Sequence, residues 1–159
     1  MNLRRTLILA ISGIAVFAAG AVATIALGSP GSGVVTTILG HRATLSDSVQ
    51  VNDDRIKFQT KDPTDFQVQT LTFQPHGFSG WHHHPGVVMV LVESVHVTTH
   101  DDNCQTRTYV PHEVFVESGT EPGLVSNESD TDIAVTYATL VAPAGSPFRI
   151  EDDPPPCAS

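Results

Sequence analysis

The 159 residues include 40% hydrophobic side chains, 12 glycines and 11 prolines, which is enough apolar surface for one compact domain but not for two separate cores. After residue 28 the chain carries six basic and 17 acidic side chains, a net charge of −11. A surface of this sign repels nucleic acid and anionic lipid, so we expect no nucleic-acid partner.

The N-terminal segment has the pattern of an export signal. Arg4 and Arg5 precede an apolar stretch that runs from Leu7 to about Leu27. Small residues at Ala21 and Ala23 offer a cleavage site, but the stretch is also about as long as the roughly 20 residues that span a bilayer. We therefore predict that residues 1–28 form an apolar helix that is either a cleaved signal peptide or a retained membrane anchor. In both cases the domain is extracytoplasmic, and this segment is its only contact with the membrane.

The rest of the chain reads as short strands separated by turns. A Gly/Ser-rich stretch predicts a flexible linker over 29–40. Residues 56–60 and 66–69 alternate apolar and polar side chains, and 71–73 resume the alternation one residue out of step, which suggests a bulge. The apolar run 87–92 predicts a buried strand, and the short runs 114–116 and 133–135 favour strands buried on both faces. An acidic, proline-rich tail follows over 151–159.

The two cysteines, Cys104 and Cys157, both follow the export segment, where oxidation is permitted. Cys104 lies in a polar turn and Cys157 follows three prolines in the tail, so a disulfide would fix the C-terminus to the end of a hairpin. We expect the two to pair; two free thiols are the alternative.

A run of three histidines, His82-His83-His84, stands at the head of the apolar stretch 87–92. Because side chains alternate along a strand, His82 and His84 share one face and His83 takes the other. Two imidazoles at this spacing on the inner face of a barrel supply half of a metal site. His82 and His84 are therefore the candidate metal ligands.

The segment from Gly77 to Gly86 resembles the first sequence motif of the cupins, small β-barrels that carry His-x-His ahead of a Glu and a Gly. Here the Glu slot holds Val88 or Met89, and the Gly slot holds Val95. In the frame of the second cupin motif, Asn127 matches, but the metal-binding His is replaced by Gly123.

The resemblance covers roughly residues 66–142, and the leader and two cysteines make the chain similar to exported single-domain cupins of actinobacteria. It implies an all-β fold, a single antiparallel, jelly-roll-like β-barrel over 41–150. It also implies a divalent metal (Zn, Fe, Mn or Ni), a small-molecule ligand, and a homodimer, since many cupins are dimers. Only His82 and His84 carry over as ligands.

A third ligand would have to come from elsewhere in the chain. We consider four further histidines for this role, His76, His96, His100 and His112, and expect His112 to be exposed in a turn. Glu93 lies too far along its strand to reach the same ion.

Three functions follow from these patterns. The favoured hypothesis is a small-molecule-binding domain with a degenerate metal site, because the Glu and the second-motif His are both missing. The alternatives are a metal-dependent enzyme of the oxygenase or isomerase type with an altered ligand set, and a structural or interaction domain. A barrel interior filled by side chains would favour the last.

Overall fold

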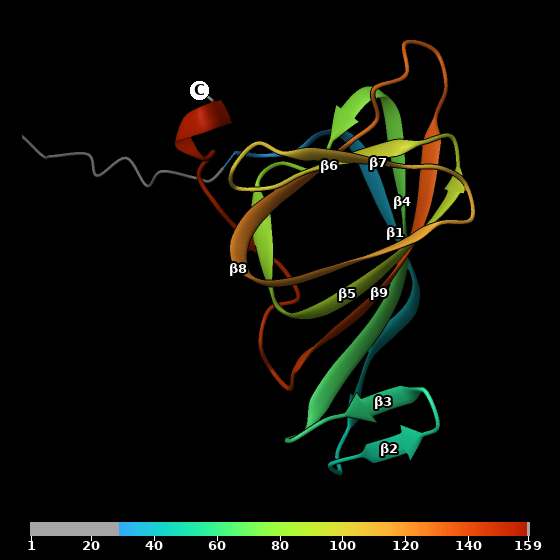
Figure 1. Cartoon of the computed structure of the whole chain (residues 1–159), viewed down its shortest axis with the longest axis vertical. Coiled ribbons are helices and arrows are strands. Elements are labelled where there is room, and N and C mark those ends of the chain that lie inside the picture. Colours follow the sequence, from blue (N-terminus) through green and yellow to red (C-terminus); the bar gives the residue numbers. More distant parts are fainter. Residues whose placement is uncertain (1–28, 159) are drawn as a thin grey trace, which may run out of the picture.

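The computed structural model describes residues 29–158, so the predicted N-terminal helix lies outside the described residues. The described chain is built almost entirely from antiparallel strands (Figure 1). The strands are β1 (Ser32–Leu45), β2 (Gln50–Asp53), β3 (Ile56–Gln59), β4 (Thr64–Phe78), β5 (His82–Ser94), β6 (Val97–His100), β7 (Thr106–Tyr109), β8 (Val114–Ser126), β9 (Ala134–Pro143) and β10 (Ile150–Glu151), followed by a 3-10 helix, η1 (Pro156–Ala158). No helix within residues 29–158 has the length and apolar character needed to cross a membrane.

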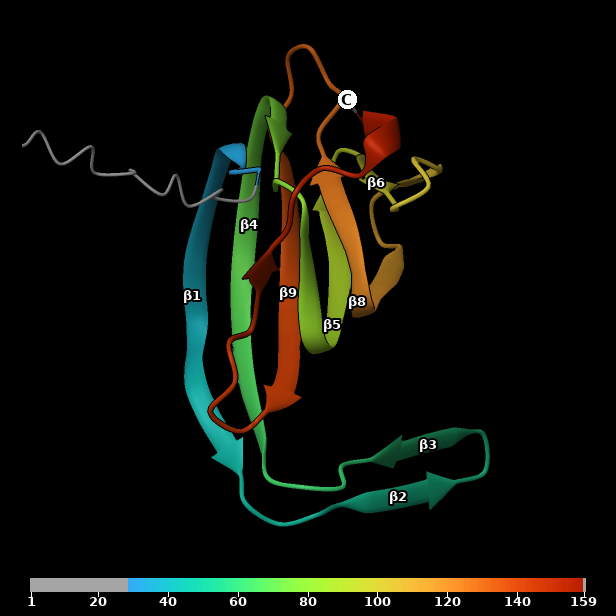
Figure 2. The same ribbon diagram turned by 90° about the vertical axis from the view of Figure 1, so that its left-hand side faces the viewer.

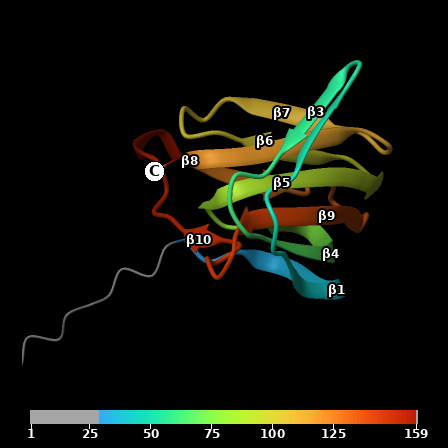
Figure 3. The ribbon, with the colours of Figure 1, turned by 90° about the horizontal axis from the view of Figure 1, so that it is seen from below.

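Eight strands form one antiparallel sheet in the order β1-β4-β9-β5-β8-β6-β7, with β10 added beside β5. Figure 3 shows the strands stacked in this order. A single further pairing, Phe78 with Ser126, joins β4 to β8, so the sheet curls back on itself around an interior. The part of the chain within residues 29–158 is thus all-β with a jelly-roll-like barrel, as the sequence predicts.

The interior is lined by alternate residues of the long strands. On β5, Val88, Val90 and Val92 are buried, whereas Val87 and Met89 are 40% and 42% exposed. The run 87–92 is therefore a strand, as predicted, but only its inner face is buried. The prediction that 114–116 and 133–135 are buried on both faces is wrong, because Val114, Val116 and Ile133 are exposed. Each buried valine contributes about 1.5–3 kcal/mol to folding, so the three inward-facing valines of β5 are enough to determine which face of the strand packs in the core.

Two other local predictions need correction. The predicted linker over 29–40 instead contains the start of β1, because this segment pairs with β4 as the edge strand of the sheet, with two register shifts before Gly40. No bulge occurs between 69 and 71, since β4 pairs with β9 without a register shift from Thr64 to Phe73. The alternation changes because Gln69 faces the interior together with Leu71 and Phe73.

Strands β2 and β3 form a separate hairpin that projects away from the barrel (Figure 2). All eight residues of these two strands are exposed. The hairpin thus contributes nothing to the barrel interior.

The C-terminal tail is held against the barrel by three kinds of contact. Strand β10 pairs with the start of β5, the Asp152 amide donates to the Trp81 carbonyl at 3.0 Å, and Cys104 and Cys157 form a disulfide with Cα atoms 6.1 Å apart. The predicted disulfide is confirmed. The tail therefore runs beside the His82–His84 segment, as Figure 2 shows along the side of the barrel.

Candidate metal centre

The first three residues of β5 are histidines, and they place two imidazoles inside the barrel and one outside it. His82 and His84 are 5% and 7% exposed, and their ring centroids are 4.8 Å apart. His83 points the other way, with Nδ1 2.7 Å from the Asp152 carboxylate. The alternation expected from the sequence is what the structure shows.

Backbone carbonyls fix the orientation of both inward rings. His82 Nδ1 lies 2.9 Å from the Gly80 carbonyl oxygen, and His84 Nδ1 lies 2.6 Å from that of Phe148. Because a carbonyl oxygen only accepts, each Nδ1 must be the protonated donor, which leaves Nε2 with the free lone pair in a neutral ring. A metal-bound histidine is usually held in this way through its other nitrogen.

Burial keeps His82 neutral. Removal from water lowers the pKa of His82 to about 4, and the nearby positive charge of Arg149 acts in the same direction. At neutral pH the His82 ring therefore offers a lone pair, as a metal ligand must.

The third candidate ligand is Glu117 on β8. The distance from His84 Nε2 to Glu117 Oε2 is 3.6 Å, and one ligand atom from each of His82, His84 and Glu117 lies within 4.8 Å of the other two. The 3.6 Å gap is too long for a hydrogen bond. His84 Nε2 is buried and has no hydrogen-bond partner among the described residues, although it faces a carboxylate. A cation between these atoms would satisfy this nitrogen, so the donor set fits a divalent metal.

The register of the sheet explains how Glu117 reaches this position. Glu117 is directly opposite Val88 in the β5–β8 pairing, so both side chains are on the inner face of the barrel. Strand β8 thus supplies a carboxylate directly opposite Val88 of β5.

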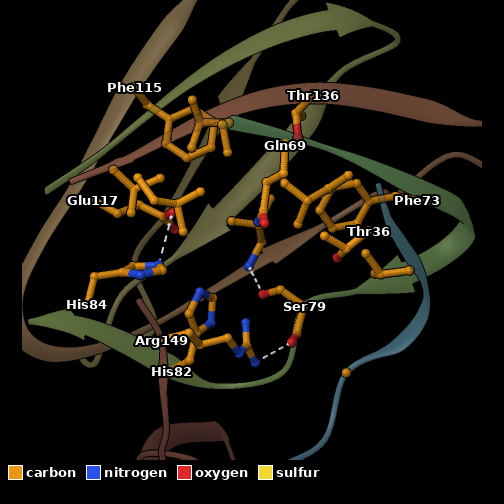
Figure 4. Close-up of a pocket in the computed structure, with 18 residues that line it drawn as sticks. Thr36, Gln69, Phe73, Ser79, His82, His84, Phe115, Glu117, Thr136 and Arg149 are labelled. Carbon is orange, nitrogen blue, oxygen red and sulfur yellow. Dashed lines mark hydrogen bonds and ion pairs between the residues drawn. The ribbon is translucent and has the colours of Figure 1, made fainter. Parts of the chain in front are cut away.

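The three residues line two cavities. The inner cavity has a volume of about 250 Å³ and extends into the barrel, with Arg149, Ser79 and Thr136 among its polar residues (Figure 4). The outer cavity has a volume of about 550 Å³ and is bordered by β6, β7 and β8. A metal between His82, His84 and Glu117 would therefore face both a protected interior and a route to solvent.

The C-terminal tail completes the wall of the inner cavity. Arg149 donates to the Ser79 carbonyl at 2.7 Å and forms a two-point ion pair with Glu151 at 2.5 and 2.7 Å. This arrangement holds the guanidinium beside His82, as Figure 4 shows. The ion pair lowers the pKa of the Glu151 carboxyl. Glu151, the first residue of the predicted acidic, proline-rich tail, thus helps to hold Arg149 in the wall of the cavity.

The other histidines considered as third ligands lie outside this group. His76 and His112 are exposed, and His76 Nε2 is 3.0 Å from the Asp130 carboxylate. His100 Nε2 lies 2.9 Å from the Ser126 hydroxyl, and His96 follows the end of β5. As expected, Glu93 is not part of the group.

Comparison with known proteins identifies the fold. No protein-family model and no curated protein matches the chain. Among solved structures, the chain is similar to Rru_A2000 from Rhodospirillum rubrum, a cupin-2 domain, with a TM-score of 0.55 and 11% identity over 77% of this chain and 68% of that one. The chain has the cupin fold.

Two other similar solved structures carry different activities in their names. The polyketide cyclase RemF from Streptomyces resistomycificus matches with a TM-score of 0.54 and 13% identity, over 78% of this chain and 74% of that one. Peruvianin-I, a cysteine peptidase from Thevetia peruviana latex, matches with a TM-score of 0.50 and 12% identity, over 76% and 68%. At this identity the likeness shows the fold alone.

The cupin frame also shows what this chain lacks. Gly123, which stands in the second-motif His slot, pairs directly with His82 across β5 and β8. A side chain there would share the inner face with His82, so the site has no imidazole at the second-motif His position, whereas a carboxylate is present at Glu117. Sequence alignment to the first motif misses Glu117 because it lies on a different strand.

Proposed function

We propose that this cupin-fold domain binds a divalent metal through His82, His84 and Glu117 and uses it to hold and activate a small molecule in the inner cavity. The observation that carries the proposal is the buried, unpartnered Nε2 of His84, which faces the Glu117 carboxylate at 3.6 Å. Two imidazoles and one carboxylate are a donor set used for catalytic zinc and for non-haem iron.

Three protein ligands leave coordination positions for a substrate or water. When bound, the metal would supply Lewis acidity to an oxygen of the small molecule. The chain's own residues orient the ligands and shield the site. The Gly80 and Phe148 carbonyls orient the imidazoles, and the apolar walls around Phe73 and Phe115 exclude water. Arg149, paired with Glu151, places guanidinium N–H donors at the same end of the cavity.

The alternative is a metal-free small-molecule-binding domain. It is supported by Gly123, which leaves the site without the imidazole that the cupin frame places opposite His82. The inner cavity itself supports small-molecule binding in either case, and it argues against a purely structural domain.

Metal analysis of protein purified without chelator or His tag tests the proposal. We expect about one equivalent of a divalent metal in the native chain. We expect its loss in Glu117→Gln and in the His82→Ala/His84→Ala double variant. His83→Ala is the matched control, because His83 lies in the same run but faces away from the cavity. Well under one equivalent in native protein, or full retention in the double variant, would overturn the proposal.

A further inference from the structure

The inner cavity has a second polar feature, far from the candidate metal ligands. The Thr136 side chain on β9 lines this cavity and is 1% exposed. Its hydroxyl oxygen is buried and, within residues 29–158, has no hydrogen-bond partner. A buried hydroxyl in this state carries an uncompensated desolvation cost, which a bound ligand could relieve.

The sheet register gives the separation of the two ends along the strand direction. Thr136 pairs with Val92, whereas Glu117 pairs with Val88, so the two lie four residues apart along β5, or roughly 13 Å at about 3.3 Å per residue. Figure 4 shows Thr136 across the cavity from His82 and Arg149. Apolar side chains, including Leu71, Val90 and Phe115, line the cavity as well.

The volume limits the size of an occupant. A cavity of about 250 Å³ holds the equivalent of roughly eight waters at about 30 Å³ each, and so a molecule of about eight non-hydrogen atoms. To reach from one end to the other, such a molecule must be unbranched and extended.

The charges define its head group. With a divalent metal, the single charge of Glu117 leaves that end of the cavity with one net positive charge. Arg149 adds none, because Glu151 neutralises it through two hydrogen bonds. A monoanionic oxygen head group balances this remaining charge.

We propose that the ligand is a short, linear carboxylate with a hydrogen-bonding group at its far end, and that Thr136 recognises that group. The carboxylate end of this assignment rests on the proposed metal site, whereas the Thr136 end does not. In this arrangement the carboxylate faces the metal, the carbon chain contacts the apolar walls, and the terminal group pairs with the Thr136 hydroxyl.

Calorimetric titration of the full chain tests the proposal with three probes: hexanoate, 6-hydroxyhexanoate and the uncharged hexanamide. For protein loaded with one equivalent of zinc, we expect 6-hydroxyhexanoate to bind at least about tenfold more tightly than hexanoate, because hexanoate leaves the Thr136 hydroxyl unpaired. We also expect hexanamide to bind more weakly than hexanoate.

Thr136→Val should remove the preference for the hydroxylated probe and leave hexanoate binding in place. Thr139→Val is the matched control, because Thr139 lies on the same strand but outside the set of cavity residues, and it should keep the preference. An unchanged preference in Thr136→Val, no binding of any probe, or equal binding of hexanamide and hexanoate would overturn the proposal.

The same titration without metal separates this inference from the proposed function. If the Thr136-dependent preference persists while zinc has no effect on hexanoate, the metal site is wrong and Thr136 recognition stands. If zinc strengthens hexanoate binding but Thr136→Val leaves the preference unchanged, the metal site stands and this inference is wrong.

Discussion

Replacing Thr136 by valine should stabilise the protein, although the residue is fully buried. Valine has nearly the same shape as threonine and differs by a methyl group in place of the hydroxyl. The Thr136 hydroxyl has no partner within residues 29–158, so the folded state bears the cost of its desolvation. That cost is about 1–3 kcal/mol for an unsatisfied buried group.

This free energy converts into a measurable shift. For a domain of this size, 1 kcal/mol corresponds to roughly 4 °C in melting temperature, so Thr136→Val should raise it by about 4–12 °C. Urea denaturation of the ligand-free protein should give a higher midpoint with an unchanged slope. Thr139→Val, on the same strand, should change the stability by less than about 0.5 kcal/mol. Destabilisation by Thr136→Val would show that the hydroxyl has a partner and would refute the reasoning.

The remaining predictions concern the site and the tail. Replacing Cys104 and Cys157 by serine opens a loop with a sequence separation of 53 and should lower the free energy of unfolding by about 4 kcal/mol, measured in urea; no change would contradict a constraint from the disulfide. The folded pKa of His82 is about 4 against 6.5 for the unfolded chain, so the unfolded state takes up this proton first. In the metal-free protein, His82 should therefore not lower the free energy of unfolding above pH 6.5. As the pH falls from 6.5 to 4, that free energy should fall by up to about 3 kcal/mol, and His82→Ala should remove this pH-dependent loss. In Gly123→His, a new Cβ meets nothing closer than 3.7 Å, and the added imidazole should strengthen zinc binding on the order of tenfold or more in a chelator competition; equal affinity would show that residue 123 does not face the metal.

The sequence predicts the barrel and half of the site because these depend on local patterns. Alternation along one strand is enough to place His82 and His84 on one face and His83 on the other. The motif that begins at Gly77 predicts the cupin β-barrel. The pairing of Cys104 with Cys157 follows from their context.

Glu117 and Arg149 could not be predicted in the same way. Glu117 reaches the site because β8 pairs with β5 in a register that sets it opposite Val88, and register between distant strands is not visible in a single sequence. Arg149 is held beside His82 by Glu151 and by the pairing of β10 with β5. Both contributions depend on long-range pairing.

Apolar runs also misled the assignment of buried faces. Val114 and Val116 are 55% and 59% exposed although they flank the buried Phe115. A continuous apolar run predicts burial on both faces, but an outer sheet surface can carry valine as well.

A crystal structure of the zinc-loaded protein with anomalous diffraction at the zinc edge tests the central claim most directly. The account predicts one anomalous peak inside the barrel, with Nε2 of His82, Nε2 of His84 and a carboxylate oxygen of Glu117 each about 2.0–2.2 Å from it. A peak at other residues, or none inside the barrel at full zinc occupancy in solution, would contradict it.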